Sequence, residues 1–212
     1  MFSIEYKGGN TVVISTKKST LVTDPKLSVI GLKDISAKGM VELATESRLA
    51  VNDPEALLRI EGPGEYEVAD FSIRGVAARR HIDGADADEL LATNYKIDVA
   101  DIRIALLGNV VPQLDEDQLE SLGIVDIAII PVGGTGYTID ATAAAGLIRQ
   151  IEPKVVIPVH YAEDGLSYEV PQEGVDTFLT ELGVPVEETS KYKIKSAANL
   201  PESLTVVKLQ RS

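Results

Sequence analysis

The sequence predicts an α/β protein of the sheet-rich sandwich type, and two observations support this prediction. Residues 126–161 follow the order buried strand, glycine-rich turn, helix and buried strand, which is typical of a β-α-β unit. Many short strand candidates precede two helices that each have one apolar face, and such faces must pack on a sheet. Because the chain has 212 residues, we expect one domain that spans residues 1–212.

The β-α-β unit is the most strongly patterned part of the chain. Residues 127–132 and 155–159 are short apolar runs, as expected of strands that are covered on both faces. Asp140 is a predicted N-cap, and the helix behind it ends before Pro153. Its apolar residues recur at helical spacing and form one stripe, made of Ala144, Leu147, Ile148 and Ile151.

The remaining elements are predicted from alternation, turn residues and caps. Strands are expected at residues 2–6, 11–15, 21–23, 40–45, 57–60, 192–195 and 204–209, with a loop and a short helical turn at 28–39. Hairpins are expected at 65–77 and 95–107. Asp115 and Gln118 form a predicted capping box, and a further helix is expected at 172–182 with Gly183 as its cap. Residues 88–92 are a candidate helix.

Composition excludes several classes of function. The formal net charge of −13 opposes binding to phosphate backbones, so nucleic acid is not an expected partner. The absence of cysteine excludes disulfides and thiolate chemistry. No apolar run approaches the ~18 residues of a membrane span, and the N-terminus lacks a signal-peptide pattern. We therefore expect a cytoplasmic protein without a membrane partner.

Polar residues follow three predicted strands. Asp24, Asn109 and His160 each stand at a strand end, and a cluster of these side chains would suit ligand binding. The alternative is that His160 is a buried histidine satisfied by backbone hydrogen bonds, and both interpretations stay open. We expect His81, which lies in an acidic stretch, to be solvated.

The glycine-rich turn at residues 133–136 has two interpretations. A turn before a helix can bind phosphate, but no lysine follows and the dinucleotide fingerprint lacks its last glycine. We therefore favour a tight turn that needs positive φ. A serine hydrolase is not supported, because no G-x-S-x-G motif occurs.

Five short motifs occur in one order along the chain. They are Thr23-Asp24-Pro25, GPGEYEV at 62–68, Leu107-Gly108-Asn109, PVGG at 131–134 and PVHY at 158–161. Together they resemble the metallo-β-lactamase superfamily, particularly the branch of L-ascorbate-6-phosphate lactonase and related Zn-dependent hydrolases. The resemblance covers most of the chain. It implies a four-layered αββα sandwich with metal ions bound at one edge, between the two sheets.

The resemblance also implies a ligand set, from which this chain departs. The family motif T-H-x-H-x-D-H aligns on residues 45–51. Positions at which the family has histidines or acids carry other residues, namely Gly9, Glu46, Arg48, Ala50, Val51 and Asn109. Only His160 matches the set.

A residue count leads to the same expectation without any alignment. A catalytic zinc uses three protein ligands, commonly imidazoles or thiolates with a carboxylate, and this chain has two histidines and no cysteine. The guanidinium of Arg48 would repel a dication and is expected to pair with Glu46 or Asp24 instead. A Mg²⁺ or Mn²⁺ site made of carboxylates alone stays open in principle.

The sequence therefore leads to a principal hypothesis and two alternatives. The principal hypothesis is a metal-free, non-catalytic binding module without a cofactor, whose partner is a small anion, a protein or a second copy of the chain. The first alternative is a hydrolase of a lactone or phosphoester that uses Zn or Mn near Asp24 and His160. The last is a nucleotide binder at residues 133–136. The candidate site residues are Asp24, Glu46, Arg48, Asn109, Gly133, Gly134, His160 and Tyr161.

Overall fold

The structure is a computed structural model that describes residues 1–80 and 91–212. In this part of the chain the strands form two sheets. The expectation for His81 lies outside the described residues. No helix in these two ranges is long and apolar enough to cross a bilayer.

The first sheet is built mainly from the N-terminal strands and has the order β13-β1-β2-β3-β4-β5. Its strands are β1 (Phe2–Gly8), β2 (Thr11–Ser15), β3 (Thr20–Thr23), β4 (Val41–Leu43), β5 (Leu58–Ile60) and β13 (Tyr192–Ile194). The strands β1, β2 and β3 pair antiparallel, whereas β3, β4 and β5 run parallel. As a result β3 and β4 end at the same edge.

The second sheet has the order β12-β14-β11-β10-β9-β8-β7-β6. Its strands are β6 (Gly64–Val68), β7 (Phe71–Arg79), β8 (Leu91–Val99), β9 (Ile102–Leu106), β10 (Ile127–Pro131), β11 (Val155–Val159), β12 (Val186–Thr189) and β14 (Thr205–Leu209). The strands β9, β10 and β11 are parallel neighbours, so their carboxyl ends also share one edge.

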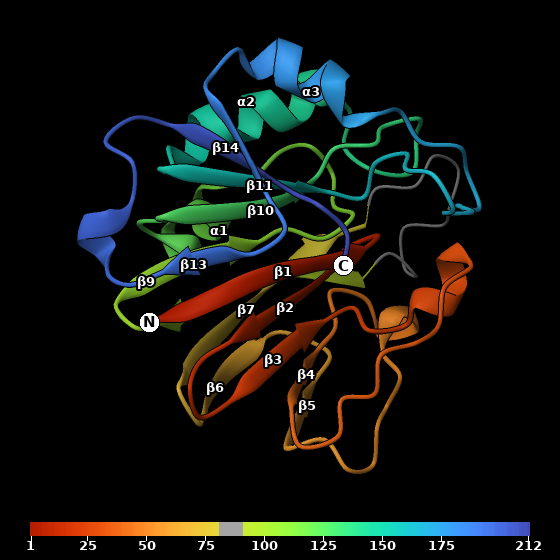
Figure 1. The fold of residues 1–212 in the computed structure, drawn as a ribbon, viewed down its shortest axis with the longest axis vertical. Coiled ribbons are helices and arrows are strands. Elements are labelled where there is room, and N and C mark those ends of the chain that lie inside the picture. The colour runs from red at the N-terminus through yellow and green to blue at the C-terminus, as the bar shows by residue number, and fades with distance from the viewer. Residues whose placement is uncertain (81–90) are drawn as a thin grey trace.

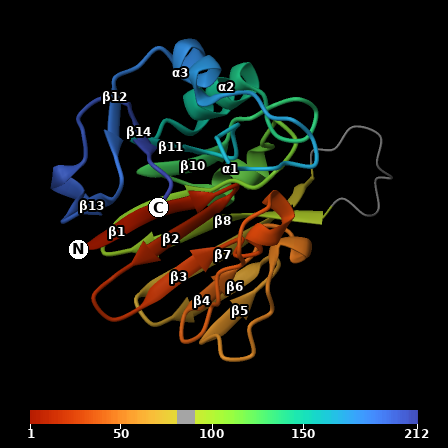
Figure 2. The same ribbon diagram turned by 45° about the vertical axis from the view of Figure 1, so that its right-hand side comes forward.

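The two sheets lie face to face, and helices cover the second one (Figure 1). The α-helices are α1 (Glu116–Leu122), α2 (Ala141–Ile151) and α3 (Val175–Leu182), and short 3-10 helices lie at Leu27–Ile30, Ser47–Leu49 and Ala197–Asn199. The helix α2 packs on β10 and against α3. Figure 2 shows both helices on the side of the second sheet that faces away from β1–β5. This arrangement confirms the predicted mixed α/β sandwich.

The β-α-β unit forms as its sequence predicts. Asp140 caps α2, because its carboxylate accepts a hydrogen bond from the Ala143 N–H at 2.8 Å. The residues of β10 and β11 are fully buried, in agreement with their continuous apolar runs. The predicted capping box at Asp115 and the two predicted hairpins are also present.

Three predictions about elements differ from the structure. The helix α3 begins at Val175 rather than at residue 172, because the Glu173 N–H binds the Gly133 carbonyl at 2.7 Å and ties this segment to the glycine turn. Leu91 and Ala92 belong to β8 rather than to a helix, since they pair with β7. The strand β12 was missed because its residues are mostly exposed and polar, without an alternating pattern.

Candidate functional site

Polar residues from both sheets meet at the edge where the parallel strands end. Asp24 follows β3, Glu46 lies just beyond β4, Asn109 follows β9 and His160 follows β11. All four side chains are buried. Burial of polar groups is costly unless they find partners, so their contacts define what the site can do.

The backbone is strained at two of these positions. Asp24 has φ 43° and His160 has φ 50°, in the left-handed region that few residues other than glycine adopt. The His160 N–H donates to the Gly9 carbonyl at 2.8 Å, which joins the end of β11 to the β1–β2 turn. Residues held in such conformations often lie at functional sites, because surrounding contacts must compensate for the strain.

The carboxylate of Glu46 is the centre of the cluster. Its Oε2 lies 2.7 Å from Arg48 Nε and 2.6 Å from Arg80 Nε. Its Oε1 accepts a hydrogen bond from Asn109 Nδ2 at 3.2 Å. Arg48 also stacks over the Tyr137 ring, 5.4 Å from its centroid, and donates to the Tyr137 hydroxyl. One carboxylate therefore faces two guanidinium groups, and we call Glu46, Arg48 and Arg80 the arginine clamp.

Arg80 is a site residue that the sequence analysis did not single out. An isolated antiparallel bridge joins Arg80 to Val110, and the Val111 N–H binds the Arg79 carbonyl at 2.9 Å. These contacts carry Arg80 to the loop that contains Asn109. A long-range bridge of this kind has no local sequence signature.

Asn10 is the second residue that sequence reasoning missed. The sequence assigned the family's early histidine position to Gly9, but it is the side chain of Asn10 that enters the cluster. Its Nδ2 donates to Asn109 Oδ1 at 3.4 Å, and its Oδ1 lies 3.0 Å from His160 Nδ1. A continuous chain of contacts thus runs from His160 through both asparagines to Glu46.

Asp24 is bound by Thr45 rather than by an arginine. The Thr45 N–H and hydroxyl donate to its two carboxylate oxygens, each at 2.7 Å. Burial raises the pKa of Asp24 to about 7, although the hydrogen bonds from Thr45 oppose this shift. Asp24 therefore carries only part of a negative charge at neutral pH.

His160 is neutral in this environment. Burial, with a further contribution from the Arg48 charge, lowers the pKa of His160 to about 3. Its ring lies between the aromatic rings of Tyr168 and Tyr137, at centroid distances of 4.7 and 5.7 Å. Within residues 1–80 and 91–212, His160 Nε2 is buried without a hydrogen-bond partner.

The other predicted site residues lie beside the cluster. Gly133 packs so closely on the His160 carbonyl that an added Cβ would lie 2.4 Å from that oxygen. Gly134 has φ +66°, as the tight-turn interpretation requires. Because Asp140 already caps α2 with a negative charge, this helix N-terminus is unfavourable for an anion. The ring of Tyr161 stacks on the ring of Tyr6, with 5.9 Å between their centroids.

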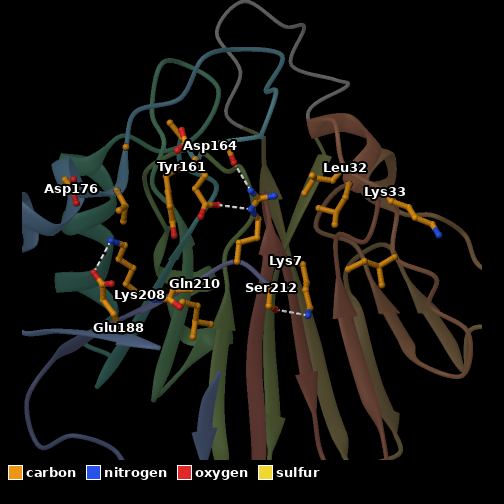
Figure 3. A pocket seen from close by; sticks show the side chains of 18 residues that line it. Lys7, Leu32, Lys33, Tyr161, Asp164, Asp176, Glu188, Lys208, Gln210 and Ser212 are labelled. Carbon is orange, nitrogen blue, oxygen red and sulfur yellow. Dashed lines mark hydrogen bonds and ion pairs between the residues drawn. The ribbon is translucent and has the colours of Figure 1, made fainter. Parts of the chain in front are cut away.

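A large cavity lies elsewhere. It has a volume of about 1010 Å³ and extends from the loop at 27–35 to the C-terminal residues (Figure 3). Tyr161 and Arg211 line it, whereas Glu46, Arg48 and His160 do not. This cavity is therefore lined by a different set of residues from the arginine clamp.

The donor atoms at the strand ends do not fit the metal that the fold implies. Thr45 occupies both oxygens of Asp24, the arginine clamp and Asn109 occupy Glu46, and Asn10 occupies one nitrogen of His160. Across the two described ranges, no group of three or more His, Cys, Asp or Glu residues is placed to hold a metal ion. A catalytic zinc needs three protein ligands.

Comparison with known proteins assigns the family. The beta-lactamase superfamily domain matches residues 3–160, which is more than half of the chain. The chain therefore belongs to this family. It is 29% identical over 92 residues to a metal-dependent hydrolase of Natranaerobius thermophilus, a match that spans 43% of this chain and 41% of that relative.

Solved structures share the fold. A protein from Thermotoga maritima, named as a proposed Zn-dependent hydrolase of the metallo-β-lactamase superfamily, superposes with a TM-score of 0.77 at 24% identity, over 99% of this chain and 100% of that chain. A metallo hydrolase from Ignicoccus hospitalis gives a TM-score of 0.65 at 15% identity, over 99% of this chain and 95% of that chain. At these identities the likeness shows the fold alone.

These comparisons bear on the two main functional hypotheses from the sequence. The chain is a metallo-β-lactamase-fold protein, and the relatives carry the names of metal-dependent hydrolases. Those names agree better with the hydrolase alternative than with the metal-free binding module. The residues at the strand ends, by contrast, do not fit a metal ion, and this favours the metal-free binding module.

Proposed function

We propose that this protein binds a small anion at the arginine clamp, without a metal ion and without catalysis. The observation that supports the proposal most directly is that two guanidinium groups, those of Arg48 and Arg80, share the single carboxylate of Glu46. Guanidinium groups present N–H donors in a planar fork that matches carboxylate and phosphate oxygens.

The charges at the clamp favour an anion. Burial alone would lower the pKa of Arg48, but the hydrogen bonds that Arg48 donates to Glu46 hold it above its ordinary value, so Arg48 is charged. His160 is neutral, and Asp24 is only partly ionised at pH 7. The cluster therefore carries excess positive charge inside a chain whose net charge is −13. An uncompensated charge that is partly removed from water is unfavourable, and a bound anion would offset that cost.

The proposal is tested by titrating inorganic phosphate into protein that has been treated with EDTA, at low ionic strength, with calorimetric detection. We expect binding that Arg48→Met weakens about tenfold or more, because hydrogen bonds to charged groups contribute about 1.5–3 kcal/mol each. Arg211→Met is the matched control, since this partly exposed arginine lines the separate cavity. Binding that needs an added metal, or that Arg211→Met alone removes, would contradict the proposal.

The names of the relatives favour a second candidate, a metal-dependent hydrolase of a lactone or phosphoester. Asp24 and His160 would hold the metal, and the strained backbone at both positions is compatible with such a role. Stoichiometric metal in protein purified without chelator, together with turnover that His160→Ala abolishes, would establish this candidate and replace the first.

A further inference from the structure

The tautomer of His160 follows from the direction of the hydrogen bonds that begin at Glu46. An ionised carboxylate only accepts hydrogen bonds, so Asn109 must present its Nδ2 to Glu46 Oε1. Its Oδ1 then accepts from Asn10 Nδ2, and this leaves Asn10 Oδ1 facing His160 Nδ1. The nitrogen Nδ1 therefore carries the proton, and Nε2 of the neutral ring is an acceptor with a free lone pair.

The nitrogen that carries this lone pair is buried. His160 is 5% exposed, and Nε2 has no hydrogen-bond partner within the described residues. The Arg48 guanidinium and the His160 ring both lie against the ring of Tyr137. The charged donor and the neutral acceptor therefore share one aromatic neighbour. The Tyr168 hydroxyl is not available to Nε2, because it donates to the Tyr161 carbonyl at 3.0 Å.

Specific interactions fix both the position and the protonation state of the His160 ring. The left-handed φ of His160 is maintained by the hydrogen bond from its N–H to the Gly9 carbonyl. Burial keeps the ring unprotonated, because the pKa of His160 is lowered to about 3. The site thus combines charged donors with one neutral acceptor, and a bare anion would satisfy only the donors.

We infer that the anion at the arginine clamp carries a hydroxyl group next to its charged group, with the anionic oxygens on Arg48 and Arg80 and the hydroxyl donating to His160 Nε2. This inference rests on the proposed anion binding and specifies the ligand class, of which small 2-hydroxy carboxylates are the simplest members. A site built to accept a hydroxyl proton discriminates against the analogue that lacks it, because the buried acceptor then stays unpaired.

The test compares lactate with propionate, two acids of the same charge that differ by one hydroxyl. Calorimetric titration of the EDTA-treated protein at pH 7 and low salt should give a Kd for lactate about tenfold lower than the Kd for propionate. This comparison uses the unaltered protein, so no folding defect can affect it. Equal affinities, or binding of neither acid by a protein that binds phosphate, would overturn the inference and leave the proposed function standing.

The variant His160→Asn tests whether Nε2 is the atom that causes the preference for lactate over propionate. Asparagine tolerates positive φ, so His160→Asn should keep the backbone while it removes Nε2. We expect the ratio of the two Kd values to fall to about one, with the Kd for propionate unchanged. Arg211→Met should keep the tenfold ratio. A ratio that survives His160→Asn would overturn the assignment, and failure of phosphate to bind the unaltered protein would refute the proposed function itself.

Discussion

Two buried carboxylates in this protein pair with arginine in different ways. Asp126 meets one guanidinium, and Arg103 donates to both of its oxygens at 2.8 and 2.9 Å. Glu46 meets two guanidiniums, those of Arg48 and Arg80. The first pair is balanced in charge and lies before β10, away from the strand ends that carry the site. The second has excess positive charge. A balanced pair needs only to hold the fold, whereas an unbalanced one is suited to a further negative partner.

Removing the central carboxylate should give the largest effect. Glu46→Gln leaves two guanidinium groups without their counter-charge, and we expect a loss of about 3–5 kcal/mol in the free energy of unfolding. Urea denaturation with and without phosphate measures the effect. Phosphate should restore part of the loss, since an anion can replace the carboxylate. If Glu46→Gln were as stable as the unaltered protein, Glu46 would not balance the charge of two guanidinium groups, and the proposed difference between Glu46 and Asp126 would be contradicted.

The stability of the cluster should also depend on pH through His160. The folded pKa of about 3 lies below the ordinary value near 6.5, so the folded state binds fewer protons than the unfolded state in this range, and stability is lost as pH falls. Compared with His160→Asn, the unaltered protein should lose about 3 kcal/mol between pH 7 and pH 4.5. Asp24, whose pKa is raised to about 7, has the opposite sign, but it is present in both proteins and cancels. Urea denaturation at the two pH values measures the effect. If the unaltered protein and His160→Asn lost the same free energy of unfolding between pH 7 and pH 4.5, this prediction would be contradicted.

Removing one of the two guanidinium groups should separate binding from stability. Arg48→Met leaves Arg80 to balance Glu46, so the free energy of unfolding should change by less than about 1 kcal/mol, as expected for a partly exposed ion pair. Phosphate affinity should nevertheless fall about tenfold or more. Thermal unfolding and calorimetry on the same sample check both parts. A large loss of stability with normal phosphate binding would show a purely structural clamp.

The balanced pair should give the smallest effect. Burial alone would raise the pKa of Asp126, but hydrogen bonds from Arg103 hold it below its ordinary value. Because the Arg103 side chain is 38% exposed, Asp126→Asn should cost only about 1 kcal/mol. The loss should be present at neutral pH and disappear as the pH falls below the ordinary range of an aspartate and through the lowered pKa of Asp126. Phosphate should not restore it, and rescue by phosphate would weaken the distinction between the two pairs.

Most of the fold was predictable because its signals are local. The N-cap at Asp140, the capping box at Asp115 and the apolar runs of β10 and β11 each lie within a few residues of the element that they define. The beginning of α3 was not predictable, because a hydrogen bond between Glu173 and the distant Gly133 decides it. Strand β12 pairs only with β14 and carries exposed polar residues, so its pairing is not visible in its own sequence.

The candidate site divides in the same way. The sequence by itself determined the shortage of metal ligands, the polar residues at the ends of β3, β9 and β11, and the proximity of Glu46 to Arg48, because counts and short spacings do not depend on folding. Only the tertiary structure decided that Arg80 and Asn10 join them. Their contacts link residues up to 150 positions apart, and such contacts arise from strand order and leave no periodic pattern in the chain.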